Sequence, residues 1–172
     1  MSVFIREAAK EDAEIIGKVA AQTFTETFEW YNTVENMRKY NETQFTTAQI
    51  LDEITDVKSV LFIALFKDEI IGYAKLKSAE APKELGNSSS IEIERLYVKK
   101  EFHDKKVGLA LMNACLKKAK AKNVNVIWLG VWEQNPKAIN FYTKVGFVKF
   151  GQHVFQLGDD AQTDYLMKLE LK

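Results

Sequence analysis

The stretch IEIERLYVKKEFHDKKVG, residues 91–108, decides the fold of this chain. It begins as a strand pattern that ends in Leu96, Tyr97 and Val98, continues through a short basic loop, and reaches Gly108 where a helix pattern begins. The first backbone N–H groups of a helix have no partner within the helix, and they lie at the positive end of its dipole. The order strand, basic loop and helix start therefore predicts an anion site, although an ordinary connection with solvated lysines would show the same pattern.

The composition is that of an ordinary globular protein. Of the 172 residues, 47% are apolar and 28% are charged, and 24 basic residues balance 24 acidic ones, so the net charge favours neither nucleic acid nor a membrane surface as partner. No apolar run approaches the ~20 residues of a membrane span, and the first residues, MSVFIREAAK, lack the core of a signal peptide. We expect one cytoplasmic domain, residues 1–172, acting as a monomer or a homodimer.

The cysteine and histidine content narrows the chemistry further. Cys115, the one cysteine, excludes an internal disulfide and lies on the apolar stripe of a predicted helix, which favours a core position over a nucleophile. The two histidines, His103 and His153, are too far apart for metal-ligand spacing. We expect no metal site, and we expect His153 to be structural.

Apolar periodicity predicts an alternation of strands and helices. Strands are expected at residues 3–6, 60–66, 70–77, 91–98, 124–131, 147–155 and 164–171, and helices at 13–24, 33–40, 46–54, 107–122 and 136–145. Thr46 and Gln49 have the form of a capping box, Asn135 is a favoured N-cap, and Gly146 is a favoured C-terminal cap. This order predicts a mixed sheet with helices on both faces.

Two blocks of sequence carry a resemblance. LYV at 96–98 is followed by FHDKKVGLALM at 102–112, and NPKAINFYTKVGF follows at 135–147. Together they resemble the acetyl-CoA signature R/Q-x-x-G-x-G/A and the later block N-x-x-A-x-x-F-Y-x-x-x-G-F of the GCN5-related N-acetyltransferase (GNAT) family. The resemblance implies the GNAT fold, an α/β (α+β) arrangement with a mixed central sheet of about seven strands flanked by about four helices. His103 stands where the signature has Arg or Gln. Lys106 stands where its first glycine is usual, so Lys106 needs an unusual backbone dihedral if the loop keeps its form.

Further segments narrow the resemblance to one group of the family. IERLYV, IWLGVWE, FYTKVGF and GQHVFQLGDDAQTDYLM are similar to bacterial polyamine acetyltransferases of the PaiA type. This implies an enzyme that transfers an acetyl group from acetyl-CoA to a small-molecule primary amine, with spermidine or spermine as the leading acceptor. Two alternatives stay open: acetylation of protein or peptide amines, and a non-catalytic acyl-CoA-binding regulatory module.

The resemblance also implies which residues bind acetyl-CoA as co-substrate. They belong to the first block and to the start of the second. They are Leu96, Tyr97, Val98, His103, Asp104, Lys105, Lys106, Val107, Gly108, Asn135, Lys137, Tyr142 and Lys144. Helix capping alone is the alternative explanation for Asn135.

Amine acetylation requires a neutral nitrogen, and a free alkyl amine with a pKa of ~10.4 is almost entirely protonated at pH 7. Glu92 and Glu94 share one face of a predicted strand and are the candidate bases; the resemblance favours Glu94, acting through water. Tyr142 is the candidate acid, which the resemblance places beside the departing sulfur. A bulge near Leu96 is implied to aim a backbone N–H at the thioester oxygen. The simpler interpretations are two solvent-facing glutamates and a core aromatic residue.

The acceptor site is expected around residues 24–31, FTETFEWY, where aromatic residues alternate with carboxylates. Carboxylates beside aromatic faces suit a polycation through charge pairing and cation–π contact. Phenylalanines at helical spacing, however, are more often simple core residues, and this is the alternative for Phe24 and Phe28. The carboxylates expected to surround one acceptor cleft are Glu26, Glu29, Glu92, Glu94 and Glu133.

Overall fold

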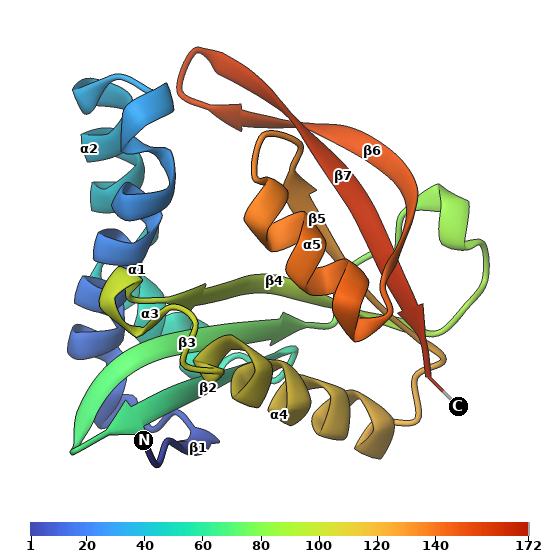
Figure 1. Cartoon of the computed structure of the whole chain (residues 1–172), viewed down its shortest axis with the longest axis horizontal. Coiled ribbons are helices and arrows are strands. Elements are labelled where there is room, and N and C mark those ends of the chain that lie inside the picture. The colour runs from blue at the N-terminus through green and yellow to red at the C-terminus, as the bar shows by residue number, and fades with distance from the viewer. Residues whose placement is uncertain (172) are drawn as a thin grey trace.

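A computed structural model describes residues 1–171, which form a seven-stranded mixed sheet and five α-helices (Figure 1). The strands are β1 (Phe4–Glu7), β2 (Ser59–Phe66), β3 (Glu69–Lys77), β4 (Ser90–Val98), β5 (Val126–Trp132), β6 (Val148–Leu157) and β7 (Asp160–Glu170). The helices are α1 (Ala13–Phe28), α2 (Val34–Gln44), α3 (Thr47–Thr55), α4 (Val107–Ala121) and α5 (Pro136–Val145). The fold class is as predicted: all five helices lie at the ranges expected from apolar periodicity, where the family resemblance implied about four.

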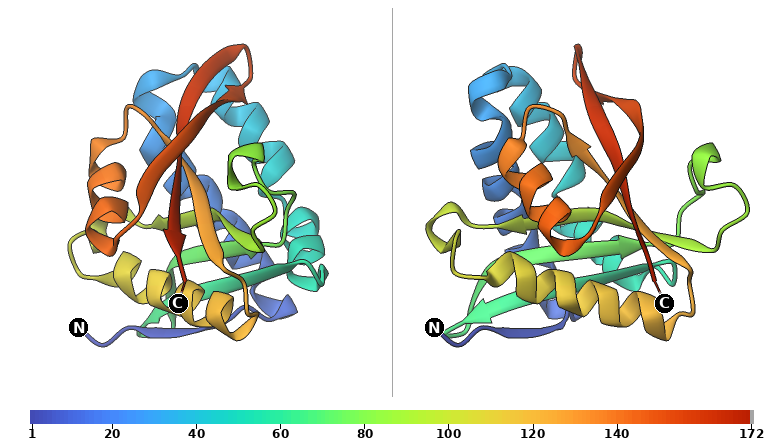
Figure 2. Two further views of the ribbon diagram at one scale, coloured as in Figure 1. Left: turned by 90° about the vertical axis from the view of Figure 1, so that its right-hand side faces the viewer. Right: turned by 45° about the vertical axis from the view of Figure 1, so that its right-hand side comes forward.

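The sheet has the order β1-β2-β3-β4-β5-β7-β6, and β4–β5 is its single parallel pair. That pair is short: residues 90–92 of β4 pair with residues 126–128 of β5, and no pairing continues beyond them. Figures 1 and 2 show the two strands diverging from this point. The sheet is therefore split at its centre, where β4 and β5 form the sides of a V.

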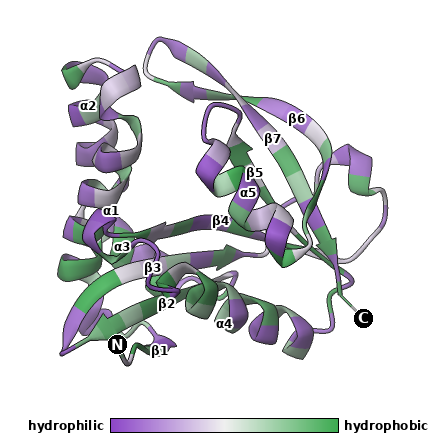
Figure 3. Cartoon of the chain, in the orientation of Figure 1, coloured by the Kyte–Doolittle hydropathy of each residue, from purple (hydrophilic) through white to green (hydrophobic). Residues whose placement is uncertain are grey.

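The two faces of the sheet are covered by different helices. Ile91 and Ile93 of β4 pack with Leu111 and Met112 of α4 in one core cluster. Tyr73 of β3 packs instead into a second cluster with the apolar residues of α1 and α3. Hydrophobic colour predominates on β2 and β5, whereas α2 is mostly hydrophilic (Figure 3). Alternate residues of each strand thus supply two cores, which matches the expectation of helices on both faces.

The β6–β7 hairpin is longer than the sequence predicted, because β7 begins at Asp160 and not at residue 164. Its turn contacts the start of α2, where Asn36 donates a hydrogen bond to Asp159 (2.7 Å). Gly158 is required there, since its φ is +64° and a Cβ would lie 2.2 Å from Oδ1 of Asn36. The polar residues 160–163 resemble a loop in sequence, yet backbone pairing with β6 makes them strand.

The predicted caps are largely confirmed. Oδ1 of Asn135 accepts a hydrogen bond from the Ala138 N–H (3.1 Å), and Gly146 ends α5 with φ of 115°. Thr46 accepts from the Gln49 N–H (3.1 Å), but the Gln49 side chain donates to Glu53 rather than back to residue 46. The capping box is therefore only half formed. Within residues 1–171, no helix is long and apolar enough to cross a membrane.

Candidate active site

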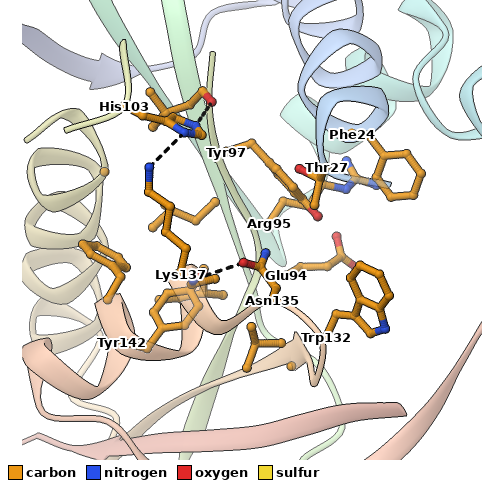
Figure 4. A pocket seen from close by; sticks show the side chains of 18 of the residues that line it. Phe24, Thr27, Glu94, Arg95, Tyr97, His103, Trp132, Asn135, Lys137 and Tyr142 are labelled. Carbon is orange, nitrogen blue, oxygen red and sulfur yellow. Dashed lines mark hydrogen bonds between the residues drawn. The ribbon is translucent and has the colours of Figure 1, made fainter. Parts of the chain in front are cut away.

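The split between β4 and β5 opens into a cleft of about 1150 Å³. Residues of α1 and α2 line one side of it, and residues of α4, α5 and the β6–β7 hairpin line the others. Figure 4 shows its two parts: His103, Lys137 and Tyr142 lie toward one side, and Phe24, Glu94 and Trp132 lie toward the other. The first group comes from the two sequence blocks described above, and we call this part of the cleft the loop side. We call the part around Phe24, Glu94 and Trp132 the aromatic side.

The loop side is built from the connection between β4 and α4. Asp104 and Lys106 both have φ of 62°, in the left-handed region, so the strained dihedral expected for Lys106 is present. The left-handed conformation costs a side-chain-bearing residue about 1–2 kcal/mol, and residues in this conformation are typical of the concave backbone turns that bind anions. A concave loop ending at a helix N-terminus fits a phosphate group.

Side chains brace this loop. Nε2 of His103 donates a hydrogen bond to the Val98 carbonyl (2.9 Å), and Nδ1 accepts from Nζ of Lys137 (3.5 Å), as Figure 4 shows. Lys137 also lies 3.5 Å from a carboxylate oxygen of Asp104. His103 therefore ties the loop to the end of β4, and Lys137 adds a positive charge from α5 to the same place. This gives a physical role to a histidine in the position where the signature has Arg or Gln.

Twelve of the thirteen residues expected to bind the cofactor line the cleft. The exception is Lys105, whose ammonium group lies over the Phe102 ring, 5.4 Å from its centre. Lys105 is therefore the one residue of this loop, among 103–108, that does not line the cleft.

Tyr142 projects from α5 into the cleft wall between the Phe141 and Phe147 rings, with centroid separations of 5.3 and 5.9 Å. Its side chain is 9% exposed, and burial raises the pKa of the phenol well above its ordinary value, so the hydroxyl stays protonated at neutral pH. The residue is thus part of the core and also borders the cleft, so the two interpretations of Tyr142 are compatible.

The expected bulge in β4 is present, but at a different residue. Lys75 of β3 pairs with Arg95, and the next residue, Leu76, pairs with Ile93, so Glu94 is the extra residue. The expectation of a bulge near Leu96 is corrected to Glu94. A bulge places two successive side chains on nearly the same side of a strand, which is how Glu94 and Arg95 both reach the α3 side of the sheet.

Glu94 and Glu92 differ sharply in their surroundings. Glu94 is ion-paired with buried Lys75 and lies 3.4 Å from Lys77. Burial alone would raise the pKa of Glu94, but hydrogen bonding and the charge of Lys75 lower it overall. Lys75 is itself held by Glu53 of α3 at 3.1 Å. Glu94 therefore stays ionised as part of a structural ion-pair network.

Glu92 has the opposite behaviour. Burial first, and then the nearby charge of Glu94, raise the pKa of Glu92 to about 7. Both carboxylates line the cleft, so neither is simply solvent-facing. A carboxylate that exchanges its proton near neutral pH is suited to general acid–base chemistry.

The aromatic side is formed by residues far apart in the sequence. Phe24 stacks on Tyr40 of α2 (4.3 Å between centroids), and Phe28 contacts Trp132 at the end of β5 (5.4 Å). Phe155 of β6 reaches Tyr40 at 6.1 Å. Phe24 and Phe28 thus belong to a core cluster and also line the cleft.

The expected carboxylate cluster is only partly correct. Glu92 and Glu94 line the cleft, whereas Glu26, Glu29 and Glu133 do not. Glu26 instead accepts hydrogen bonds from Gln22 and from the Lys100 N–H. Glu26 lies in the last turns of α1, Glu29 begins the short 3-10 turn after it, and Glu133 lies in the turn after β5, so none of the three shares a strand face with Glu92 and Glu94.

The structure adds two residues that we did not expect to line the cleft. His153 of β6 and Asp164 of β7 are direct cross-strand partners, with Nε2 3.6 Å from Oδ2. We expected His153 to be structural, yet its side chain is 47% exposed and borders the cleft. The sequence feature that could have identified His153 is the alternation of side chains along a strand. It places Gly151, His153 and Phe155 on one face of β6.

Comparison with known proteins agrees with this geometry. The profile of the Acetyltransferase (GNAT) family matches residues 21–147, which is more than half of the chain. The chain belongs to the GNAT family. It is 35% identical, over 98% of both chains, to an uncharacterized N-acetyltransferase of Lactobacillus delbrueckii subsp. lactis. It is 30% identical to the spermidine N(1)-acetyltransferase of Thermoplasma acidophilum, over 98% of this chain and 97% of that one.

A solved GNAT structure extends the likeness to three dimensions. The PaiA N-acetyltransferase of Thermoplasma acidophilum, crystallised in complex with coenzyme A, aligns with a TM-score of 0.81 and 25% identity, covering 99% of this chain and all of that one. The chain is therefore an N-acetyltransferase that uses acetyl-CoA, as the two sequence blocks implied.

Proposed function

We propose that this acetyltransferase transfers the acetyl group to a primary amine of a polyamine, with spermidine or spermine as the acceptor. The observation that carries the proposal is the composition of the aromatic side, where the carboxylates of Glu92, Glu94 and Asp164 face a cleft walled by aromatic rings. Such a site suits a flexible polycation, because it offers charge pairing together with cation–π contact. The similarity to a spermidine N(1)-acetyltransferase supports the same acceptor.

The loop side would hold the cofactor. The backbone from His103 to Gly108, with the N-terminus of α4, would bind the pyrophosphate, and Asn135 would border the pantetheine arm. The cofactor supplies an activated acetyl thioester. The contacts of His103 and Lys137 brace the loop, which would reduce the conformational entropy that it loses when the cofactor binds.

The protein's own residues would move two protons. Glu92, with a pKa of about 7, accepts the proton of the incoming ammonium, which leaves the nitrogen lone pair free to form the new C–N bond. After the C–N bond has formed, the nitrogen would release its second proton to solvent; as the C–S bond breaks, the phenol of Tyr142 would donate its proton to the sulfur and be reprotonated from solvent. We assign the base role to Glu92 rather than Glu94, because Glu94 is already paired with Lys75.

A thiol-release assay with acetyl-CoA tests the acceptor. The wild-type protein is offered spermidine, spermine, an aminoglycoside, and a peptide with a free N-terminus. We expect the highest kcat/KM with a polyamine. We also expect the KM for spermidine to increase with salt, since charge pairs are screened with a Debye length of ~8 Å at physiological ionic strength.

The outcome that contradicts the proposal is equally definite. If the peptide or the aminoglycoside is acetylated and neither polyamine is, the polyamine assignment is wrong, while the family and the cofactor are unaffected.

A further inference from the structure

We propose that Asp164, held in place by His153, binds a second ammonium group of the acceptor and so selects amines that carry more than one charge. This inference deepens the proposed polyamine activity and rests on it. The pair lies on the β6–β7 hairpin, outside both sequence blocks of the cofactor site, and it lines the same cleft as Glu92.

A gap in β5 exposes the pair to the cleft. Trp128, Gly130 and Trp132 share one face of β5, and the glycine is exposed while the two tryptophans are buried. A Cβ at position 130 would lie 3.4 Å from Oδ2 of Asp164 and 3.5 Å from Nε2 of His153. The missing side chain therefore leaves a space in the cleft wall that ends on these two polar atoms.

The charges in the cleft leave Asp164 available for a cation. Glu94 is held by Lys75 and Lys77, whereas His153 is the basic partner of Asp164 among residues 1–171. Burial raises the pKa of Asp164 and the positive charge of His153 opposes that rise, with a net increase. A half-buried carboxylate with a single titratable partner is stabilised when a ligand ammonium reaches it.

Several elements bring negative charge to this region. Burial raises the pKa of the Tyr40 phenol, and the positive charge of Arg95 opposes this rise. The negative charges of Glu94, Glu53 and Asp164 raise the same pKa further. The carboxylates of β4 and β7 therefore act on the same phenol of α2, which itself lines the cleft. A cation between them would interact with both strands.

The spacing suits an acceptor with two amines. Glu92 of β4 pairs with Trp128 of β5, and Asp164 of β7 pairs with Trp132, four residues further along β5, a step of roughly 13 Å along the strand. An acceptor that gives one proton to Glu92 and keeps a charged ammonium at Asp164 would thus lie extended along β5, which the flexible methylene chain of a polyamine allows. Asp164 supplies the charge, and His153 fixes the carboxylate.

The experiment compares spermidine with butylamine, a monoamine acceptor, in four proteins: wild type, Asp164→Asn, His153→Gln and the control Glu170→Gln. Glu170 is a carboxylate on the same strand, 76% exposed, and does not line the cleft. We expect Asp164→Asn to raise the KM for spermidine roughly tenfold or more, with kcat changed less than about twofold and the KM for butylamine unchanged. His153→Gln should change the same KM in the same direction but less, and Glu170→Gln should behave as wild type.

Calorimetric titration of spermidine into protein saturated with coenzyme A provides a readout that is independent of turnover. The affinity should fall in Asp164→Asn by the same factor as the KM rises. Equal effects on spermidine and butylamine, an effect on kcat alone, or no effect would each overturn this inference and leave the polyamine proposal intact. Failure of the wild-type protein to acetylate spermidine would instead overturn the proposed function.

Discussion

At the scale of single residues, neighbours two positions apart on β4 acquire different chemistry. Glu94 is the bulged residue and meets Lys75, so its pKa is lowered, whereas Glu92 is half-buried without such a partner, so its pKa is raised to about 7. The ionised state of Glu94 also contributes to the rise at Glu92. Glu94 is therefore structural, and its negative charge helps to keep the pKa of Glu92 near neutral pH.

The raised pKa of Glu92 has a consequence for stability. The folded state holds the Glu92 proton more tightly than the unfolded state, whose pKa is near 4.5, so this residue's contribution to stability is complete below pH 4.5 and is lost as the pH rises to about 7. A glutamine cannot ionise, so Glu92→Gln does not lose this stability as the pH rises. We expect the variant to be more stable than wild type at pH 8 by roughly 1–3 kcal/mol, and to lose that advantage at pH 4.5. Urea unfolding of both proteins at the two pH values measures the difference; an advantage independent of pH would contradict the raised pKa.

Removing the hydroxyl of Tyr142 separates its two possible roles. Tyr142→Phe keeps the packing against Phe141 and Phe147 but removes the proton donor, so kcat should fall ~10²–10⁴-fold while acetyl-CoA affinity stays nearly constant. Tyr165→Phe removes a hydroxyl outside the cleft and serves as the control. Steady-state kinetics and calorimetric titration measure the two quantities. Wild-type turnover in Tyr142→Phe would leave Tyr142 with a packing role only.

At the scale of elements, we propose that the connection between β4 and α4 binds the cofactor through its backbone. Two left-handed residues, Asp104 and Lys106, shape it, and His103 fixes it to the end of β4. The side chain of Lys105 faces Phe102 and contributes little to the cleft. Cofactor binding should therefore depend on N–H groups more than on lysine charge.

Substitutions at Gly108 test this dependence. Gly108 lies in the first turn of α4, where its N–H has no partner in the helix and proline is tolerated. Gly108→Pro removes that N–H and should weaken acetyl-CoA binding at least tenfold. Gly108→Ala keeps it, and its Cβ would meet Phe141 at an ordinary 3.7 Å, so the affinity should change little, as it should for Lys105→Ala. Calorimetric titration that gave equal losses in all three variants would exclude a backbone cradle.

At the scale of the whole molecule, the split sheet and the hairpin that leans onto α2 create one continuous cleft. Asn36 holds the hairpin turn at Asp159, and a second contact joins Asn32 to Asp160 (3.1 Å). The aromatic side is therefore assembled from α1, α2, β5 and β6 only when the chain has folded completely.

The reactivity of the Cys115 thiol is a measure of that complete folding. Its side chain is 0% exposed, and burial raises the pKa of the thiol to about 12, so the reactive thiolate is scarce in the folded protein. Ellman's reagent should label no thiol in native buffer and one thiol per chain in concentrated urea. Rapid labelling of the native protein would show that the core beneath the cleft opens locally. The expected inertness also means that Cys115 adds no background to a thiol-release assay.

The sequence by itself determined the features that depend on residues close together in the chain. The order of strands and helices, the caps at Asn135 and Gly146, the core position of Cys115 and the left-handed Lys106 all follow from periodicity, local hydrogen bonding or steric limits on φ. The cofactor loop belongs to this group, because it is formed by consecutive residues, and its motif was readable for that reason.

Only the tertiary structure decided the features that depend on strand register and on which elements become neighbours. The bulge at Glu94, its pairing with Lys75, the approach of His153 and Asp164 to Gly130, and the exclusion of three expected glutamates from the cleft are of this kind. Each arises from contacts between segments distant in the chain. Because the free energy that fixes them comes from packing and charge pairing across the sheet, no local pattern of residues encodes them.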